Sequence, residues 1–178
     1  IERAIGLFRQ AVEHDPLSAA SYRNLASALH AASCFAESEQ EFRKALELAP
    51  RSPITQGNFS LTLLSLGRGE EALAEAMRET DDVYRPWALG IIYNALGRRA
   101  DSDEALRDLI EKGAADAAFQ IAELHAARGE ADAAFEWLER AYAQRDSGLS
   151  DPKFNPQLRS LHGDPRWSAF MKKMGFEV

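Results

Sequence analysis

The chain repeats itself with a period of about 34 residues. Residues of the same kind recur at this offset: Phe8 and Phe42, Ala11 and Ala45, Pro16 and Pro50, Asn24 and Asn58, Leu29 and Leu63. Farther along, the offset shortens to 30 and then to 32, which carries Gly67 to Gly97 and then to Gly129. A chain built this way stacks similar units on one another, and each unit buries its apolar face against its neighbours.

Each unit reads as a helical hairpin. Large and small residues alternate at helical spacings on both sides of a glycine, which suits the turn between two helices. Small residues mark places where two helix backbones approach closely: Ala26, Ser60, Gly90 and Ala122 in the first helices, and Ala72, Ser102 and Ala134 in the second. The pattern predicts units at 19–50, 53–82, 83–114 and 115–146, with 1–16 as the second half of an earlier unit.

Residues 21–50, SYRNLASALHAASCFAESEQEFRKALELAP, resemble the tetratricopeptide repeat family. The matching positions are Tyr22, Leu25, Ala26, Leu29, Phe35, Phe42, Ala45 and Pro50. The resemblance extends over about residues 1–146, with departures at Ser33, Ser38 and Glu79, where the family usually has glycine, alanine and a small residue. It implies an all-α fold, a right-handed superhelix of antiparallel helical hairpins, and a non-catalytic scaffold that binds other proteins.

Residues 147–178 do not follow the repeat. Asn155-Pro156 and Asp164-Pro165 each resemble a helix N-cap followed by proline at the first helical position. We therefore expect two short helices, at about 156–162 and 165–174, with Gly175 ending the second. Their apolar residues would form a helical cap over the last hairpin.

The charge pattern argues against nucleic acid as a partner. The chain has 21 basic and 28 acidic residues, a net charge of −7, and no basic stripe that would neutralise phosphates. No apolar run approaches the length of a membrane-spanning helix, so no membrane partner is expected. We expect a cytoplasmic location, with the periplasm left open because the sequence begins at Ile1 rather than at Met.

The residues that support chemistry are scattered. His14, His30, His125 and His162 lie far apart, and Cys34 is the single cysteine, so no metal site is expected. His125 occupies the position of Leu29 and Leu63, which predicts a packed, hydrogen-bonded histidine. No nucleophile motif or phosphate-binding loop is present, and we expect neither catalytic residues nor a cofactor.

In tetratricopeptide proteins the first helices of successive units line a concave groove, and the resemblance implies the same surface here. The predicted peptide-binding groove consists of Arg23, Asn24, Ser27, Ile54, Asn58, Leu61, Tyr84, Trp87, Ile91 and Gln120. His30, Phe119 and Glu123 fall at further positions of this surface.

Two readings of these groove residues stay open. Asn24, Asn58 and Gln120 either form a ladder of amides for a peptide backbone or reflect how often Asn precedes Leu in this repeat. Tyr84 and Trp87, with Ile54, either hold an apolar side chain of the partner or pack between hairpins. The two-carboxylate clamp of some family members is not expected, because Ser27, Tyr84 and Ala88 replace residues that it needs.

The N-terminal half repeat offers a second surface. Without its hairpin mate, the helix of residues 1–14 would expose an apolar stripe of Ile1, Ile5, Phe8 and Val12, which predicts weak self-association. For the whole chain, we expect a scaffold that binds a partner peptide or protein. The alternative is a C-terminal regulatory module of a larger bacterial enzyme or transcription regulator, with its catalytic or DNA-binding domain upstream.

Overall fold

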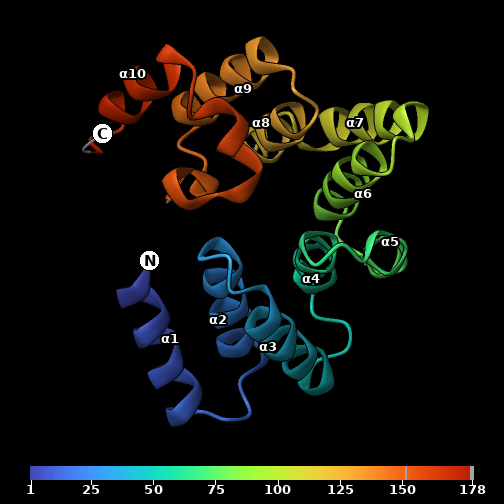
Figure 1. The fold of residues 1–178 in the computed structure, drawn as a ribbon, viewed down its shortest axis with the longest axis vertical. Coiled ribbons are helices and arrows are strands. Elements are labelled where there is room, and N and C mark those ends of the chain that lie inside the picture. Colours follow the sequence, from blue (N-terminus) through green and yellow to red (C-terminus); the bar gives the residue numbers. More distant parts are fainter. Residues whose placement is uncertain (151, 177–178) are drawn as a thin grey trace.

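In the computed structural model, residues 1–150 and 152–176 are described, and every regular element in those two ranges is a helix (Figure 1). The α-helices are α1 (Glu2–His14), α2 (Ala19–Ala31), α3 (Phe35–Leu48), α4 (Thr55–Ser65), α5 (Gly69–Ala76), α6 (Tyr84–Ala95), α7 (Arg99–Gly113), α8 (Ala118–Ala127), α9 (Ala131–Gln144) and α10 (Pro165–Lys173). Three 3-10 helices precede α10: η1 (Ser147–Ser150), η2 (Pro152–Phe154) and η3 (Pro156–Leu161). The predicted all-α solenoid of hairpins is confirmed.

The four hairpins are α2–α3, α4–α5, α6–α7 and α8–α9, and the same kind of turn closes each one. Gly67, Gly97 and Gly129 have φ angles of 77°, 73° and 75°, and Ser33 takes their place in the first hairpin with φ of 63°. After each of these residues, a backbone N–H donates to the carbonyl five residues back: Cys34 to Leu29, Arg68 to Leu63, Arg98 to Tyr93 and Glu130 to His125. This helix-ending motif needs a left-handed residue, which explains the recurring glycine.

Helices of one hairpin cross at the small residues of the repeat. Ala26, Ser60 and Ala122 are fully buried, as are Ala72 and Ala134 in the second helices. At the matching positions in α3 and α7, Ser38 Oγ donates to the carbonyl of Ala26 and Ser102 Oγ to that of Gly90, both at 2.8 Å. Serine at 38, where the family usually has alanine, is therefore used to tie the two helices together.

The C-terminal residues pack on the last hairpin, as the sequence predicts. Leu158 and Leu161 of η3 join Trp167, Phe170 and Met171 of α10 in one buried cluster with residues of α8 and α9. Asn155 and Asp164 accept backbone N–H bonds from residues two positions on, at 2.9 Å each, so the expected N-caps form. The first of the two expected helices is a 3-10 helix, and η1 and η2 were not expected from the sequence.

The prediction of an unpaired apolar stripe on residues 1–14 is wrong. Ile5 is buried against Leu25, Ala28 and Leu29 of α2, and Ile1, Phe8 and Val12 pack against the same cluster. The N-terminal half repeat therefore uses α2 as its neighbour, and its apolar face is part of the core. Self-association through this helix stays a prediction without its original structural basis.

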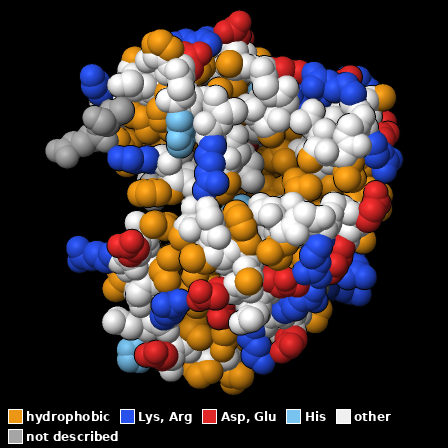
Figure 2. Space-filling model, viewed as in Figure 1, with side chains coloured by type: hydrophobic (Ala, Val, Ile, Leu, Met, Phe, Trp, Pro, Cys, Tyr) orange, Lys and Arg blue, Asp and Glu red, His pale blue; other side chains and the backbone are white. Residues whose placement is uncertain are grey.

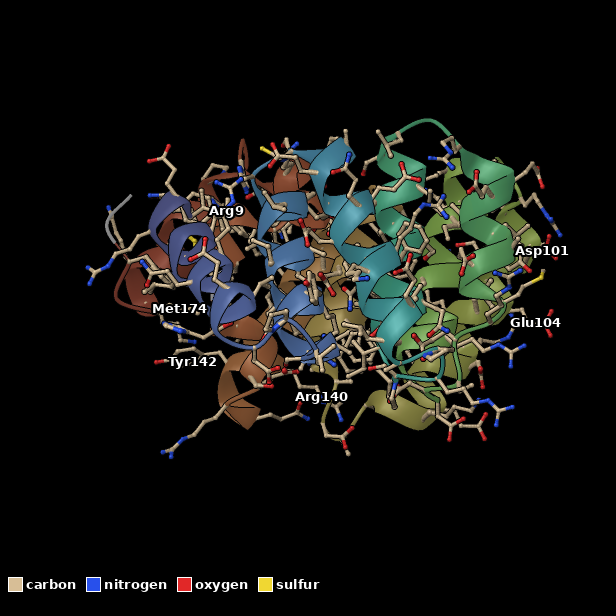
Figure 3. The ribbon with its side chains drawn as sticks, turned by 90° about the horizontal axis from the view of Figure 1, so that it is seen from below. Arg9, Asp101, Glu104, Arg140, Tyr142 and Met174 are labelled. Carbon is tan, nitrogen blue, oxygen red and sulfur yellow. The ribbon has the colours of Figure 1, made fainter. Side chains whose placement is uncertain are left out.

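The hairpins follow a curve that brings the two ends of the chain to the same side of the molecule, as both ribbon views show (Figures 1 and 3). Among the described residues, Arg159 Nη2 in η3 donates a hydrogen bond to Ser33 Oγ in the first hairpin turn, at 2.7 Å, which joins the two ends of the solenoid. Among the helices described, none has the length and apolar character that crossing a membrane requires.

Candidate binding groove

The inner side of the curve holds a cavity of about 460 Å³. Its walls come from α1 (Ile1, Ala4, Phe8), α2 (Asn24, Ser27, Ala28, His30, Ala31), α3 (Phe42), α4 (Asn58, Leu61), α6 (Trp87), α8 (Glu123) and the C-terminal segment (Gly148, Ser150, Phe154, Asn155, Pro156, Gln157). On the face shown in Figure 2, hydrophobic side chains gather in a hollow on the side of the molecule where Figure 1 places α6. A cavity of this size is in the range of protein sites that bind small ligands or peptide side chains.

The structure brings half of the predicted groove residues to this cavity and leaves the other half outside it. Asn24, Ser27, Asn58, Leu61 and Trp87 line the cavity. Arg23, Ile54, Tyr84, Ile91 and Gln120 lie outside its lining. Ile91 is buried in the central core, and Ile54 is the residue before α4, with a left-handed backbone at φ of 74°.

The predicted amide ladder is divided between different environments. Asn24 is exposed in the cavity wall. Asn58 also lines the cavity, but its Nδ2 donates to the carbonyl of Ile54 at 2.9 Å. Gln120 is mostly buried, and its Nε2 lies 3.5 Å from the hydroxyl of Tyr84. Of these three amides, those of Asn24 and Asn58 belong to residues that line the cavity, and that of Gln120 does not.

Trp87 takes both of the roles left open by the sequence. Its side chain is 4% exposed, belongs to the central core and meets Tyr84 edge to face at 5.4 Å between ring centroids. It also contributes to the cavity wall. Tyr84 itself lies behind this wall, and burial raises the pKa of its hydroxyl to about 12.

His30 ends a buried chain of hydroxyl groups on one side of the cavity. Its Nδ1 lies 2.9 Å from Thr62 Oγ1, which lies 3.2 Å from Ser38 Oγ. Burial, together with the nearby positive charge of Arg159, lowers the pKa of His30 to about 4. The imidazole is therefore neutral near pH 7.

Glu123 is the carboxyl group of the opposite wall and is 3% exposed. Its Oε1 accepts a hydrogen bond from Asn155 Nδ2 at 2.6 Å. Burial raises the pKa of Glu123 to about 8, while the amide of Asn155 and the nearby indole N–H of Trp87 oppose the rise and the charge of Asp146 adds to it. Asn155 thus holds one oxygen of Glu123 in place, and burial disfavours the charged form of the carboxyl group.

The C-terminal segment forms a wall of the cavity that the sequence did not reveal. A Cβ atom on Gly148 would lie 2.4 Å from the side chain of Phe119, so only glycine lets the backbone of η1 pass so close to α8. Ser160 Oγ donates to the carbonyl of Ala126 at 3.0 Å, which holds η3 against the same helix. Positions of α8 that the repeat pattern assigns to an open groove are therefore covered by the chain itself.

Charged side chains lie mainly on the outside. Arg9, Asp101, Glu104 and Arg140 lie at the periphery of the molecule in Figure 3, and none of them lines the cavity. His125 is the packed histidine predicted from the repeat, with Nδ1 2.7 Å from Glu130 Oε2. The described residues hold no group of three or more His, Cys, Asp or Glu side chains that could bind a metal ion.

The family model for the tetratricopeptide repeat matches residues 1–53 and 88–148. This chain belongs to the tetratricopeptide repeat family. No curated protein matches it. Among solved structures, the tetratricopeptide chain is similar to the crystal structure of MamA, with 16% identity and a TM-score of 0.54 over 79% of this chain and 86% of the other. It also matches YrrB, a TPR protein with an unusual peptide-binding site, with 20% identity and a TM-score of 0.49 over 83% of this chain and 80% of the other.

Membership in the tetratricopeptide repeat family gives the general role of the chain. Proteins of this family are generally non-catalytic, and this chain is a scaffold for protein–protein interaction. The structural likeness to MamA supports the same helical repeat fold.

Proposed function

We propose that this scaffold binds a peptide segment of a partner protein in the cavity on the inner side of its curve. In this proposal residues 1–146 are the solenoid that presents the groove, and residues 147–178 are a cap that supplies one wall. The supporting observation is that α2, α4, α6 and α8, the first helices of all four hairpins, contribute residues to one cavity. A groove shared by successive repeats suits an extended segment of chain.

The wall offers two kinds of contact to such a segment. Asn24 is exposed and can both donate to and accept from a peptide backbone, and Asn58 keeps its carbonyl oxygen as an acceptor. Phe8, Leu61 and Trp87 supply apolar surface for a side chain of the partner. Ile54, Tyr84 and Gln120 lie outside the cavity lining, so we assign them no direct contact.

Affinity capture tests this proposal with a variant that fills the cavity. Ser27 is exposed, lines the cavity and tolerates a larger side chain without disturbing the core, so Ser27→Trp blocks the site. Ala74→Trp, on the exposed face of α5, is the matched control. The expected partner is a protein, sought in the cytosol of the source organism, that the original chain and the Ala74 variant retain and the Ser27 variant loses.

Circular dichroism and thermal unfolding should show that both variants fold like the original chain. If the Ser27→Trp variant retains the same proteins as the original chain, the partner binds elsewhere and the proposal is wrong.

A further inference from the structure

The cavity gathers most of the unpaired polar groups in the interior of the molecule. Among the described residues, four buried side-chain atoms have no hydrogen-bond partner: His30 Nε2, Trp87 Nε1, Glu123 Oε2 and Gln144 Oε1. The first three belong to residues that line the cavity. Buried polar groups are normally hydrogen-bonded, so three such groups around one cavity indicate surfaces made for a polar ligand.

The hydroxyl chain beside His30 fixes what its free nitrogen can do. Ser38 has one hydroxyl proton and donates it to the carbonyl of Ala26, so Thr62 must donate to Ser38. Thr62 then has no proton for His30, and Nδ1 of His30 must carry the hydrogen of their 2.9 Å contact. In the neutral imidazole, Nε2 is therefore an acceptor.

The indole N–H of Trp87 lies close enough to Glu123 to lower its pKa, so two of the unpaired groups are left for a ligand: Nε2 of His30 and Oε2 of Glu123. Nε2 of His30 accepts. Before a ligand binds, burial keeps Glu123 protonated near pH 7, and its Oε2 accepts once a cation displaces that proton. A ligand that satisfies them needs more N–H groups than carbonyl oxygens on the side that faces the wall. Ammonium and guanidinium groups have several N–H donors and no acceptor.

The charges around the cavity favour a positive group near Glu123. Among the described lining residues, Glu123 is the only carboxyl group and none is lysine or arginine. Asp146 adds negative charge on the Glu123 side, and its own oxygens are held by the backbone N–H groups of Phe119 and Gly148. Arg159 acts on His30 and not on Glu123, so the positive end of a ligand belongs at the Glu123 side.

Building on the proposed function, we propose that the cavity selects a peptide bearing a lysine or arginine side chain, whose cationic group pairs with Glu123. Asn155 orients the carboxylate from Oε1 and leaves Oε2 for the cation. The indole N–H of Trp87 supports the ionised carboxylate of Glu123, and a backbone N–H of the peptide donates to His30 Nε2. The pair forms in surroundings with little water, where charge-assisted hydrogen bonds are strong.

Fluorescence anisotropy with peptide libraries tests this specificity. The probes are labelled hexapeptides with blocked ends, random except for one central residue that is lysine, arginine or norleucine, the last having the length of lysine without its charge. A fourth library has norleucine at the centre and a free α-amino group, with the label at its C-terminus. We expect the lysine and arginine libraries to bind about tenfold more tightly than blocked norleucine.

Two variants assign this preference to a residue. Glu123→Gln keeps the acceptor for Asn155 and removes the charge, so it should bind the lysine and norleucine libraries equally. Glu104→Gln removes the same charge from the outer surface and should keep the preference. If the free α-amino library alone binds tightly, the cation comes from a chain terminus, and the assignment to a side chain is overturned.

The outcomes separate this inference from the proposed function. Equal binding of the lysine and norleucine libraries to the original chain, abolished by Ser27→Trp, would support the groove and overturn the cation preference. A preference for lysine that survives Glu123→Gln would also overturn it. Absence of binding by every library would contradict both proposals.

Discussion

The carboxyl group of Glu123 couples the stability of the protein to pH. Its pKa is about 8 in the folded chain, against an ordinary value of 4.5. Between these values the folded state keeps a proton that the unfolded state has lost, so the free energy of unfolding falls as pH rises from 4.5 to 8. A variant without the carboxyl group should not show this fall in the free energy of unfolding. We expect Glu123→Gln to equal the original chain near pH 5 and to be more stable by roughly 3 kcal/mol at pH 7.

Urea unfolding at pH 5, 6, 7 and 8 measures the effect as a difference between the two proteins, in which the titration of other groups cancels. A difference that stays constant across this range would show that Glu123 keeps an ordinary pKa in the folded chain, contrary to the prediction.

At the scale of a single helix, Glu79 caps the N-terminus of α4 although it lies 22 positions from its partner in the sequence. Its side chain is 1% exposed, and Oε2 accepts from the backbone N–H of Gly57, in the first turn of α4, at 2.9 Å. Oε1 accepts from the backbone N–H groups of Thr80 and Asp81 at 2.8 and 3.0 Å. Because Glu79→Ala leaves three backbone donors unpaired, we expect it to lower the free energy of unfolding by about 3 kcal/mol.

Chemical denaturation checks this value, with Glu111→Ala on the exposed surface of α7 as the control, expected to change stability by less than about 0.5 kcal/mol. A loss no greater for Glu79→Ala than for this control would mean that the beginning of α4 does not depend on the carboxylate.

Elements of the fold that depend on local geometry could be predicted from the sequence. A turn that needs a left-handed residue selects glycine, so Gly67, Gly97 and Gly129 marked three hairpins correctly. Asn155 and Asp164 likewise marked helix starts because their side chains bond to neighbouring backbone groups.

Features that depend on residues distant in sequence could not be predicted in this way. Glu79 departs from the repeat, and its partner Gly57 lies 22 positions away. Gly148 and Asn155 lie against α8, and the sequence around them has no periodicity that indicates this contact. Half of the predicted groove residues therefore line the cavity. Residues of the C-terminal segment and of α1 also line it, and the sequence did not predict this.

At the scale of the whole molecule, each repeat contacts its neighbours, and a hydrogen bond between described residues also links the two ends of the solenoid. In a solenoid each unit packs on the next, so the two ends are held together only through the units between them. Here Arg159 and Ser33, separated by 126 positions, add a direct hydrogen bond between η3 and the first hairpin turn. Since Arg159 is exposed, we expect Arg159→Ala to change stability by less than about 1 kcal/mol but to let the ends move apart.

Double electron–electron resonance spectroscopy measures the distance between two spin labels, one on each end of the solenoid. The labels replace Gln10 on α1 and Lys172 on α10, both exposed, in a Cys34→Ser background that removes the native thiol. We expect one narrow distance distribution for the labelled chain and a broader, longer one for Arg159→Ala. The control is Arg107→Ala, which removes an exposed arginine of α7 that is far from Arg159 in the sequence. It should leave the distance distribution narrow. An unchanged distribution in the Arg159 variant would instead show that the packing of η3 on α8 alone sets the width of the groove, because that packing is kept in both variants.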